Sequence, residues 1–172
     1  MERLFLDFET RSTLDIKKVG AWKYAMDRST EALCLAFSWD GGPVQVLTQE
    51  DLNRGRRPWV EAGRIDDFVL VAHSAHFEYA IWNYCLAEKV LGWPAIKDPK
   101  RWDCTLARAA VCNLPLSLDQ CCEALKTPHK KDLEGRAVML KLCKPLSFCP
   151  VSLDPIYNED KSIVVVYNGE IY

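Results

Sequence analysis

The sequence predicts an α/β fold in which helices flank a mixed β-sheet. Three short apolar segments, at residues 3–9, 32–39 and 68–72, are predicted strands because turn signals bound them and they are too short for helices. An Asp-Gly-Gly-Pro turn at 40–43 joins the second segment to a return strand at 44–47, which makes a hairpin. Strand, hairpin and then helix is an element order typical of a mixed sheet with helices packed on it.

The composition is that of a soluble globular protein with one domain. The chain has 172 residues, of which 49% are hydrophobic and 27% charged, and this length supports a sizeable core. A net charge of −2 gives no overall basic field for nucleic acid, although a local basic groove stays open. No apolar run approaches membrane-spanning length, and no signal peptide precedes the first strand. We therefore expect a cytoplasmic protein with no membrane partner.

Eight cysteines are spread along the chain without a metal-binding pattern. There is no C-x-x-C pair and no grouping of Cys and His with zinc spacing. Most of them lie inside apolar helical patterns. We expect reduced, buried thiols, as is usual in a cytosolic protein.

Two stretches between the predicted strands are less regular. Residues 11–26 are expected to form a loop with a short helical turn, broken at Gly20. Residues 48–66 are polar and contain several arginines, and a solvated loop and helix is favoured there over a binding patch.

Further helices are predicted after the strand at 68–72. The first has apolar residues at helical spacing and ends at Trp93-Pro94. Asp103-Cys104-Thr105 and Ser117 are predicted to cap two more helices, and residues 132–144 form a fourth. The residues expected on the apolar faces of the two capped helices are Leu106, Ala109, Ala110 and Val111 in one, and Leu118, Cys121, Cys122 and Leu125 in the other.

Two acidic residues interrupt the first strand two positions apart. Side chains at i and i+2 of a strand point to the same face, so Asp7 and Glu9 lie side by side among apolar neighbours. An unpaired buried carboxylate is costly, and two together repel each other unless a cation lies between them. Mg²⁺ takes oxygen ligands and is often held by one or two carboxylates together with substrate phosphate. The pair is therefore either the start of a metal site for phosphoryl transfer or a strand edge with two solvated acids.

A third acid follows the next buried strand. Glu78 falls in the first turn of the helix that begins there, where an acid suits the helix dipole by about a few tenths of a kcal/mol. The functional alternative is a third carboxylate that points back over the strand ends toward Asp7 and Glu9. His73 and His76 lie in the same turn, and we expect them to be hydrogen-bonded structural residues rather than metal ligands.

Several segments carry a family resemblance when they are taken together. They are FLDFETRSTLDIKKVGAWKYA, CLAFSWDGGPVQV, AHSAHFEYAIW, WDCTLARAAVCNLPLSLDQCCEALK and KKDLEGRAVMLKLCKP, in that order. Over roughly residues 3–145 the chain resembles the amino-terminal 3′–5′ exonuclease domain of phage-type family A DNA polymerases. The resemblance implies a DEDD exonuclease on a ribonuclease H-like fold. It places Asp7 and Glu9 in the first exonuclease motif and Glu78 in the second, as catalytic residues and as ligands of Mg²⁺ or Mn²⁺.

The resemblance also suggests which residues surround the acids. Thr10, Ser74 and Phe77 are expected to bind substrate, although the second motif usually has Asn where this chain has Ser74. Asp103 matches a helix-capping position of the family and is expected to be structural. The aromatic residues available for stacking on bases are Phe77, Tyr79 and Trp82. These rings are expected mainly in the core.

The last part of the chain departs from that family. Its third motif, Tyr-x-x-x-Asp on a last helix, is not found, because the spacing from Tyr157 to Asp160 is short by one. The polymerase domain is absent from this chain. Residues 1–148 are therefore expected to form an exonuclease-like domain truncated before its last helix. Residues 149–172 form a tail of unrelated character, which resembles the amidotransferase domain of asparagine synthetase without that family's amino-terminal Cys.

The function expected from these observations is proofreading-type hydrolysis of single-stranded DNA or 3′ DNA ends. Asp7, Glu9 and Glu78 would hold Mg²⁺ or Mn²⁺, and the missing third motif predicts weak or absent activity. Two alternatives stay open: a non-catalytic nucleic-acid-binding remnant, and a structural or interaction domain that uses the fold alone. Metal-dependent nuclease activity separates the first hypothesis from the others, and binding of single-stranded DNA separates the second from the third.

Overall fold

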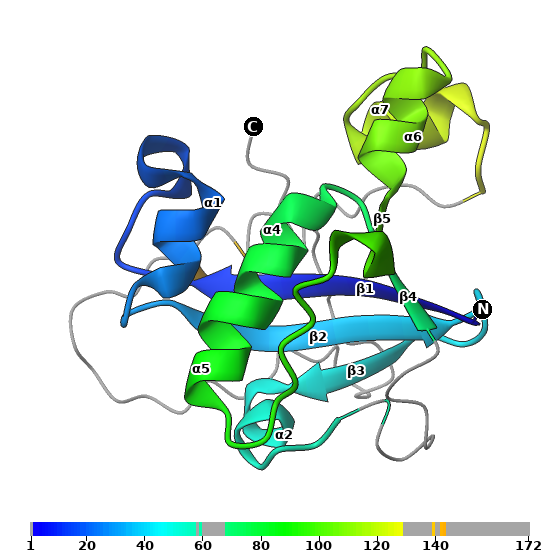
Figure 1. Cartoon of the computed structure of the whole chain (residues 1–172). Helices are drawn as coiled ribbons and strands as arrows, with labels where there is room; N and C mark the ends of the chain where they lie inside the picture. Colours follow the sequence, from blue (N-terminus) through cyan, green and yellow to red (C-terminus); the bar gives the residue numbers. More distant parts are fainter. Residues whose placement is uncertain (1, 58, 60–67, 129–138, 140–141, 144–172) are drawn as a thin grey trace, which may run out of the picture.

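The computed structural model describes residues 2–57, 59, 68–128, 139 and 142–143. Within them lies a five-stranded sheet in the order β3-β2-β1-β4-β5, with helices along it (Figure 1). The strands are β1 (Glu2–Arg11), β2 (Glu31–Trp39), β3 (Gln45–Thr48), β4 (Phe68–Ala72) and β5 (Trp102–Cys104). The acidic segment therefore lies on the central strand of the described sheet.

The directions of the strands make the sheet mixed. β1 is antiparallel to β2, and β2 to β3, whereas β4 is parallel to β1 and β5 is parallel to β4. The predicted α/β fold class is confirmed, and the arrangement is consistent with the ribonuclease H-like fold that the resemblance implies. The predicted hairpin is also present, and its turn places Asp40 and Gly41 at φ of 47° and 75°.

A helical layer covers one face of the sheet (Figure 1). α4 (Ala75–Ala80) leads directly into a π-helix, η1 (Ile81–Leu86), and then into α5 (Ala87–Lys89). α1 (Ile16–Met26) packs against α4 and η1. Short helices α2 (Gln49–Asn53) and η2 (Pro99–Arg101) lie in the connections. No helix in the described part of the chain is long and apolar enough to cross a membrane.

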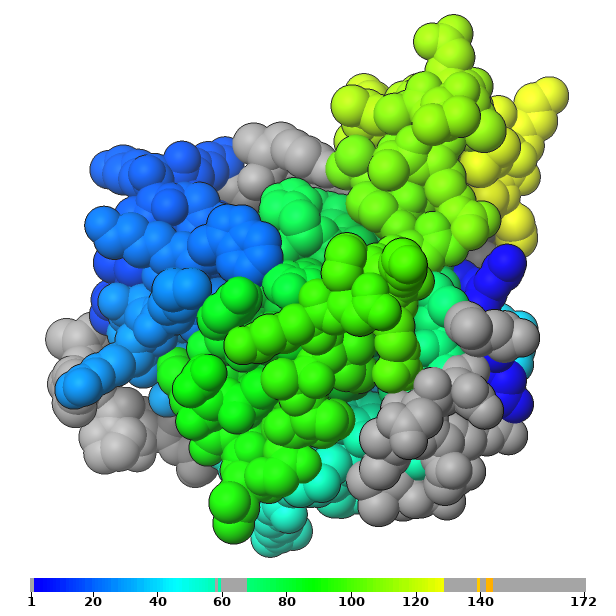
Figure 2. Space-filling model, viewed as in Figure 1, coloured from blue at the N-terminus to red at the C-terminus, as the bar shows by residue number. Residues whose placement is uncertain are grey.

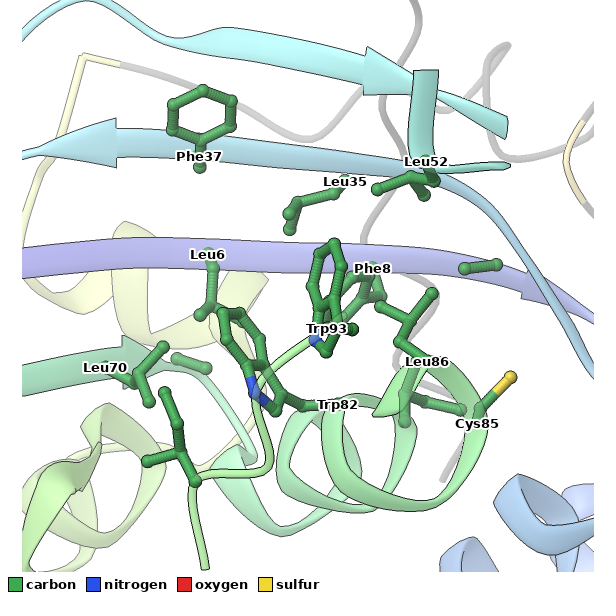
Figure 3. Close-up of a cluster of buried hydrophobic side chains, with 14 of the residues drawn as sticks. Leu6, Phe8, Leu35, Phe37, Leu52, Leu70, Trp82, Cys85, Leu86 and Trp93 are labelled. Carbon is green, nitrogen blue, oxygen red and sulfur yellow. The ribbon is translucent and has the colours of Figure 1, made fainter. Parts of the chain in front are cut away.

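The core lies between this helical layer and the sheet. Leu6 and Phe8 of β1 point toward Trp82 and Trp93 (Figure 3), and the rings of Phe8 and Trp82 meet edge to face with centroids 6.4 Å apart. Trp59 also packs on Trp82, with centroids 4.6 Å apart. Such aromatic contacts add about 0.5–1.5 kcal/mol each beyond the area they bury. Trp82 is thus a core residue, as predicted, and is not available to stack on bases.

The segment after β1 is more helical than the sequence predicts. α1 begins after Asp15, whose carboxylate accepts a hydrogen bond from the backbone N–H of Lys17 at 3.0 Å and so caps the helix. The predicted break at Gly20 is confirmed as a kink with φ 77° and ψ 163°, a conformation that favours glycine. Packing of the residues beyond the kink against α4 explains why helix forms where a loop was predicted.

Two other helix boundaries differ from the prediction. The helix expected to end at Trp93-Pro94 ends at Lys89, because Val90 is extended and Gly92 has a positive φ of 74°. Asp103 lies in β5 rather than capping a helix, and Cys104 is the residue that precedes α6 (Thr105–Val111), without a capping side-chain bond. The predicted cap of α7 (Leu118–Ala124) is confirmed, because Ser117 Oγ accepts from the backbone N–H of Gln120 at 3.3 Å.

The apolar faces predicted for α6 and α7 are only partly buried. Ala109 and Cys121 are buried, but Ala110 is exposed, Val111 is 88% exposed and Leu125 is 57% exposed. Both helices stand out from the sheet and its helical layer (Figures 1 and 2). The two predictions are therefore confirmed for Ala109 and Cys121 and wrong for Ala110, Val111 and Leu125. An apolar period marks one face of a helix, but burial also requires another element packed on that face.

The cysteines follow the prediction in their chemistry and only partly in their burial. The seven cysteines of the described residues carry free thiols, of which Cys85 and Cys121 are buried and Cys112 is exposed. Cys112 contradicts the expected burial because it follows α6 in the projecting pair of helices. Most of the helix predicted at 132–144, the third-motif region and the tail at 149–172 lie outside the described residues.

Candidate active site

The acidic segment of β1 lies where the central strand runs past its neighbour. β1 pairs with β4 from Glu2 to Phe5, whereas it pairs with β2 as far as Arg11. Within the described sheet, Asp7 and Glu9 therefore come after the last β4 partner of β1. This half of β1 is paired with β2 on one side. On its other side lies the segment that follows β4, which includes the start of α4.

The two acids lie on the face of β1 opposite the core. Leu6 and Phe8 are buried against the helical layer, and side chains alternate between the faces of a strand. Asp7 is half-buried, whereas Glu9 is only 3% exposed. The predicted placement of both carboxylates on one face is thus present in the structure, and the reading of Glu9 as a solvated acid does not fit its burial.

Glu78 reaches the open side of β1 from the turn after β4. Ser74 adopts a left-handed conformation (φ 66°, ψ 43°) that reverses the chain, and α4 begins at the next residue. Glu78 lies in the first turn, as predicted. Its own backbone N–H and that of Phe8 favour the charged carboxylate and partly offset the rise in its pKa. The side chain therefore lies beside β1 near Phe8, beyond the last β4 partner.

Glu78 and Asp7 form an interacting pair of acids. Glu78 is 2% exposed, and burial, followed by the negative charge of Asp7, raises the pKa of its carboxyl well above the ordinary value. Among the described residues, Glu78 Oε2 is a buried oxygen that has no hydrogen-bond partner. Burial of such an oxygen is unfavourable unless a proton or a cation satisfies it.

The surroundings of Glu9 contain thiols that sequence reasoning did not place there. Cys34 lies directly opposite Glu9 on β2. Burial, and then the charges of Glu9 and Asp7, raise the pKa of Cys34 to about 12. Burial and the charge of Glu9 likewise raise the pKa of Cys143 to about 11. Both thiols therefore stay protonated beside the acids at neutral pH. The signal in the sequence was only their apolar context, which does not reveal a cross-strand partner.

The three acids do not form a ready-made metal cage. In the part of the chain that the structure describes, no group of three or more His, Cys, Asp or Glu side chains is arranged to hold a metal ion. The structure brings Asp7 and Glu78 together as a pair, with Glu9 two residues along the same strand.

The residues expected to bind substrate have different surroundings. Thr10 is buried, and its hydroxyl lies 3.0 Å from the hydroxyl of Tyr24. Phe77 is half-buried, and its ring centroid lies 6.2 Å from that of Tyr24. Ser74 Oγ lies 3.2 Å from His76 Nδ1. Tyr24 thus contacts two of the three predicted residues, although the sequence did not single it out.

His73 and Asp103 both have polar partners of their own. His73 is hydrogen-bonded through both ring nitrogens, to Thr105 Oγ1 at 3.0 Å and to the carbonyl of Leu116 at 2.8 Å, as expected for a structural histidine. Asp103 forms an ion pair with Arg108, with Arg108 Nε donating at 2.8 Å. Its expected structural role is consistent with this pair, although it does not cap the helix.

Comparison with known proteins finds similarity to part of a phage DNA polymerase. No family model matches the chain. The chain is 28% identical over 148 residues to the DNA polymerase of Bacillus phage SP02, and the match covers 84% of this chain and 22% of that polymerase. The chain thus spans about a fifth of the length of this curated relative. The similarity supports a domain related to part of a phage DNA polymerase.

Proposed function

We propose that this domain is a metal-dependent 3′–5′ exonuclease-like domain that acts on DNA ends. The observation that carries the proposal is the position of three acids where β1 runs past β4: Asp7 and Glu9 follow the last β4 partner of β1, and Glu78 lies in the first helical turn after β4. The charge of Asp7 acts on Glu78 there. Similarity over most of the chain to a phage DNA polymerase supports DNA as the substrate. The resemblance of the acidic motifs to a proofreading exonuclease supports the reaction class.

A divalent cation fits the donor set of this site in part. Asp7 and Glu78 repel each other, and the buried oxygen Glu78 Oε2 has no hydrogen-bond partner in the described structure. Mg²⁺ and Mn²⁺ take oxygen ligands, and a site with one or two carboxylates leaves room for substrate phosphate. We therefore assign Asp7 and Glu78 as the residues that would hold an ion, and Glu9 as the third carboxylate. When bound, such an ion lowers the pKa of its water and stabilises charge on the leaving oxygen.

The chain's own residues would orient this chemistry. Glu78 lies in the first turn of α4 and is buried, so its carboxylate has little freedom to move before a substrate arrives. Phe77 is half-buried and precedes Glu78, and we assign it to the wall along which a 3′ end would lie. Thr10 follows Glu9 but is buried against Tyr24, so we assign it a supporting place behind that wall. Ser74 forms the turn that aims α4 at β1.

A second candidate is a non-catalytic nucleic-acid-binding domain with the same fold. The observation that favours it is the lack of a three-ligand metal group in the described residues. An ion held by two carboxylates binds weakly without substrate phosphate, which agrees with the weak activity expected from the sequence.

Digestion of a 3′-labelled single strand tests the proposal. With Mn²⁺ present, we expect slow shortening from the 3′ end by the unmodified chain and none by Asp7→Ala. Glu88→Ala, which removes an exposed acid from α5, is the matched control and should digest like the unmodified chain. Strand binding without any digestion would favour the second candidate. Digestion that survives Asp7→Ala would contradict the proposed site.

A further inference from the structure

Tyr24 contacts a neighbour of Glu9 on β1 and a neighbour of Glu78 on α4. Its hydroxyl lies 3.0 Å from the hydroxyl of Thr10, the residue that follows Glu9. Its ring lies 6.2 Å, centroid to centroid, from that of Phe77, the residue that precedes Glu78. Tyr24 comes from α1, so a third element joins the strand and the helix that carry the acids. This juxtaposition is independent of the position of Glu78 beside β1.

The position of Tyr24 is fixed from its own backbone. Thr30, which is fully buried, donates a hydrogen bond from its hydroxyl to the carbonyl of Tyr24 at 2.6 Å. The same hydroxyl lies 2.8 Å from that of Ser12, at the end of β1. Upstream, the kink at Gly20 separates the turn that holds Tyr24 from the start of α1. The phenol is therefore held at a set distance from β1, as a rigid support must be.

The hydroxyl of Tyr24 has a specific partner in addition to its place in the core. Tyr24 is 6% exposed, and a buried hydroxyl is unfavourable unless it is hydrogen-bonded. Burial raises its pKa to about 12, so the phenol stays neutral. A phenylalanine would fill nearly the same volume without this requirement. The bond to Thr10 is what the hydroxyl adds.

We infer that Tyr24 is a positioning residue that sets the spacing of Glu9 and Glu78. It acts on Glu9 through Thr10 and on Glu78 through Phe77, and it touches neither a metal nor substrate. The inference rests on the proposed function, because the spacing of the two acids affects metal affinity only if they bind the same cation. Residues that hydrogen-bond directly to metal ligands typically change metal affinity about 10–100-fold when they are removed, and we expect the low end of that range for Tyr24, which acts through a neighbour of each acid.

A Mn²⁺ titration followed by thermal unfolding tests this role. The readout is the Mn²⁺ concentration that gives half of the maximal rise in melting temperature. Tyr24→Phe removes the hydroxyl and keeps the ring, and we expect it to raise that concentration about 10-fold. Tyr84→Phe removes the hydroxyl of a half-buried tyrosine in η1, and we expect it to leave that concentration unchanged.

Variants of Thr10 test the same bond from the β1 side. Thr10→Val removes the partner hydroxyl and should shift the Mn²⁺ midpoint as Tyr24→Phe does, whereas Thr10→Ser should keep it. The double variant Thr10→Val/Tyr24→Phe should be no worse than either alone, since both changes delete one bond. These variants keep the test decisive if Tyr24→Phe folds poorly.

The outcomes separate this role from the proposed function. A Mn²⁺ response in the unmodified chain that is unchanged in Tyr24→Phe and in Thr10→Val would overturn the role of Tyr24 and leave the proposed function intact. A loss of metal-free melting temperature with an unchanged midpoint would reduce Tyr24 to a core residue. No Mn²⁺ response in the unmodified chain would overturn the proposed function, and this role with it.

Discussion

The two halves of β1 have opposite surroundings. Around Leu4 and Phe5 the strand is paired with both β2 and β4, and Leu4 is fully buried in the core. From Asp7 onward the described pairing continues with β2, and Glu78 lies close to the backbone of Phe8 where β4 no longer pairs. The first half of β1 is thus paired with a strand on each side. Along the second half, the side chain of Glu78 lies where β4 no longer pairs.

This difference explains how a sheet can hold acids without losing its stability. The apolar half supplies the packing that fixes the strand, and the acids are placed beyond the last β4 partner of β1. Buried acids cost stability. Substitutions that remove a charge beside the acidic half should therefore raise the free energy of unfolding, whereas truncations in the apolar half should lower it. The predictions below test that contrast, from the largest expected effect to the smallest.

Truncation of the apolar half should have the largest effect. Leu4→Ala removes a fully buried side chain and leaves a cavity, so we expect a loss of about 2–5 kcal/mol in the free energy of unfolding, measured by urea denaturation. Leu91→Ala is the control, because Leu91 is 96% exposed and should change stability by less than about 0.5 kcal/mol. A Leu4→Ala loss as small as that of the control would show that β1 is not fixed by its apolar half.

Neutralising Glu78, which lies beside the acidic half of β1, should raise the free energy of unfolding, by less than Leu4→Ala lowers it. Burial and the charge of Asp7 raise the pKa of Glu78 in the folded state. A raised carboxyl pKa means that the folded state binds the proton more tightly, so stability is full below the unfolded pKa and falls as the pH rises through the folded pKa. Glu78→Gln removes this loss. It should therefore be more stable than the unmodified chain at pH 7 without metal.

The pH dependence isolates the contribution of Glu78. The difference in unfolding free energy between Glu78→Gln and the unmodified chain should be smallest below pH 4.5, the ordinary pKa of the group, and grow as the pH rises. Chemical denaturation in a chelating buffer across this range measures it. A difference that does not change with pH would contradict the raised pKa.

Removing the backbone strain at Ser74, in the turn before α4, should have the smallest effect on stability. Ser74 has a positive φ of 66°, which costs a residue with a Cβ more than it costs glycine. Ser74→Gly should stabilise the chain by about 0.5–1 kcal/mol, seen as a higher urea midpoint. Ser74→Ala is the matched variant, because it loses the same hydroxyl and keeps the strain. If Ser74→Ala stabilises as much as Ser74→Gly, the backbone conformation is not the cause.

The sequence predicted the parts of this arrangement that depend on local pattern. Short apolar segments identified β1, β2 and β4, and the spacing of Asp7 and Glu9 placed both on one face. Glu78 was placed in a first helical turn by its distance from the preceding strand. These inferences need only the repeat of a strand or a helix, which a sequence displays directly.

What the sequence could not predict depends on contacts between distant segments. The position of Glu78 close to the Phe8 backbone depends on where β4 stops pairing, and pairing register is not visible in either strand alone. Tyr24 looked like one apolar residue in a loop with a short helical turn, because its partner Thr10 lies on another element. The expected helix-capping role of Asp103 was wrong, since β5 extends the sheet to that residue, while its ion pair with Arg108 is consistent with the structural role that the resemblance implies.

The central claim is that Asp7 and Glu78 share a divalent cation, and Mn²⁺-dependent thermal unfolding tests it most directly. An ion that binds only the folded state adds about 2.7 kcal/mol at 100 times its dissociation constant, or a rise of roughly 5–10 °C for a chain of this size. We expect that rise in the unmodified chain and in Glu88→Ala, and its loss in Asp7→Ala. An equal rise in Asp7→Ala, or no rise in the unmodified chain, would contradict the account.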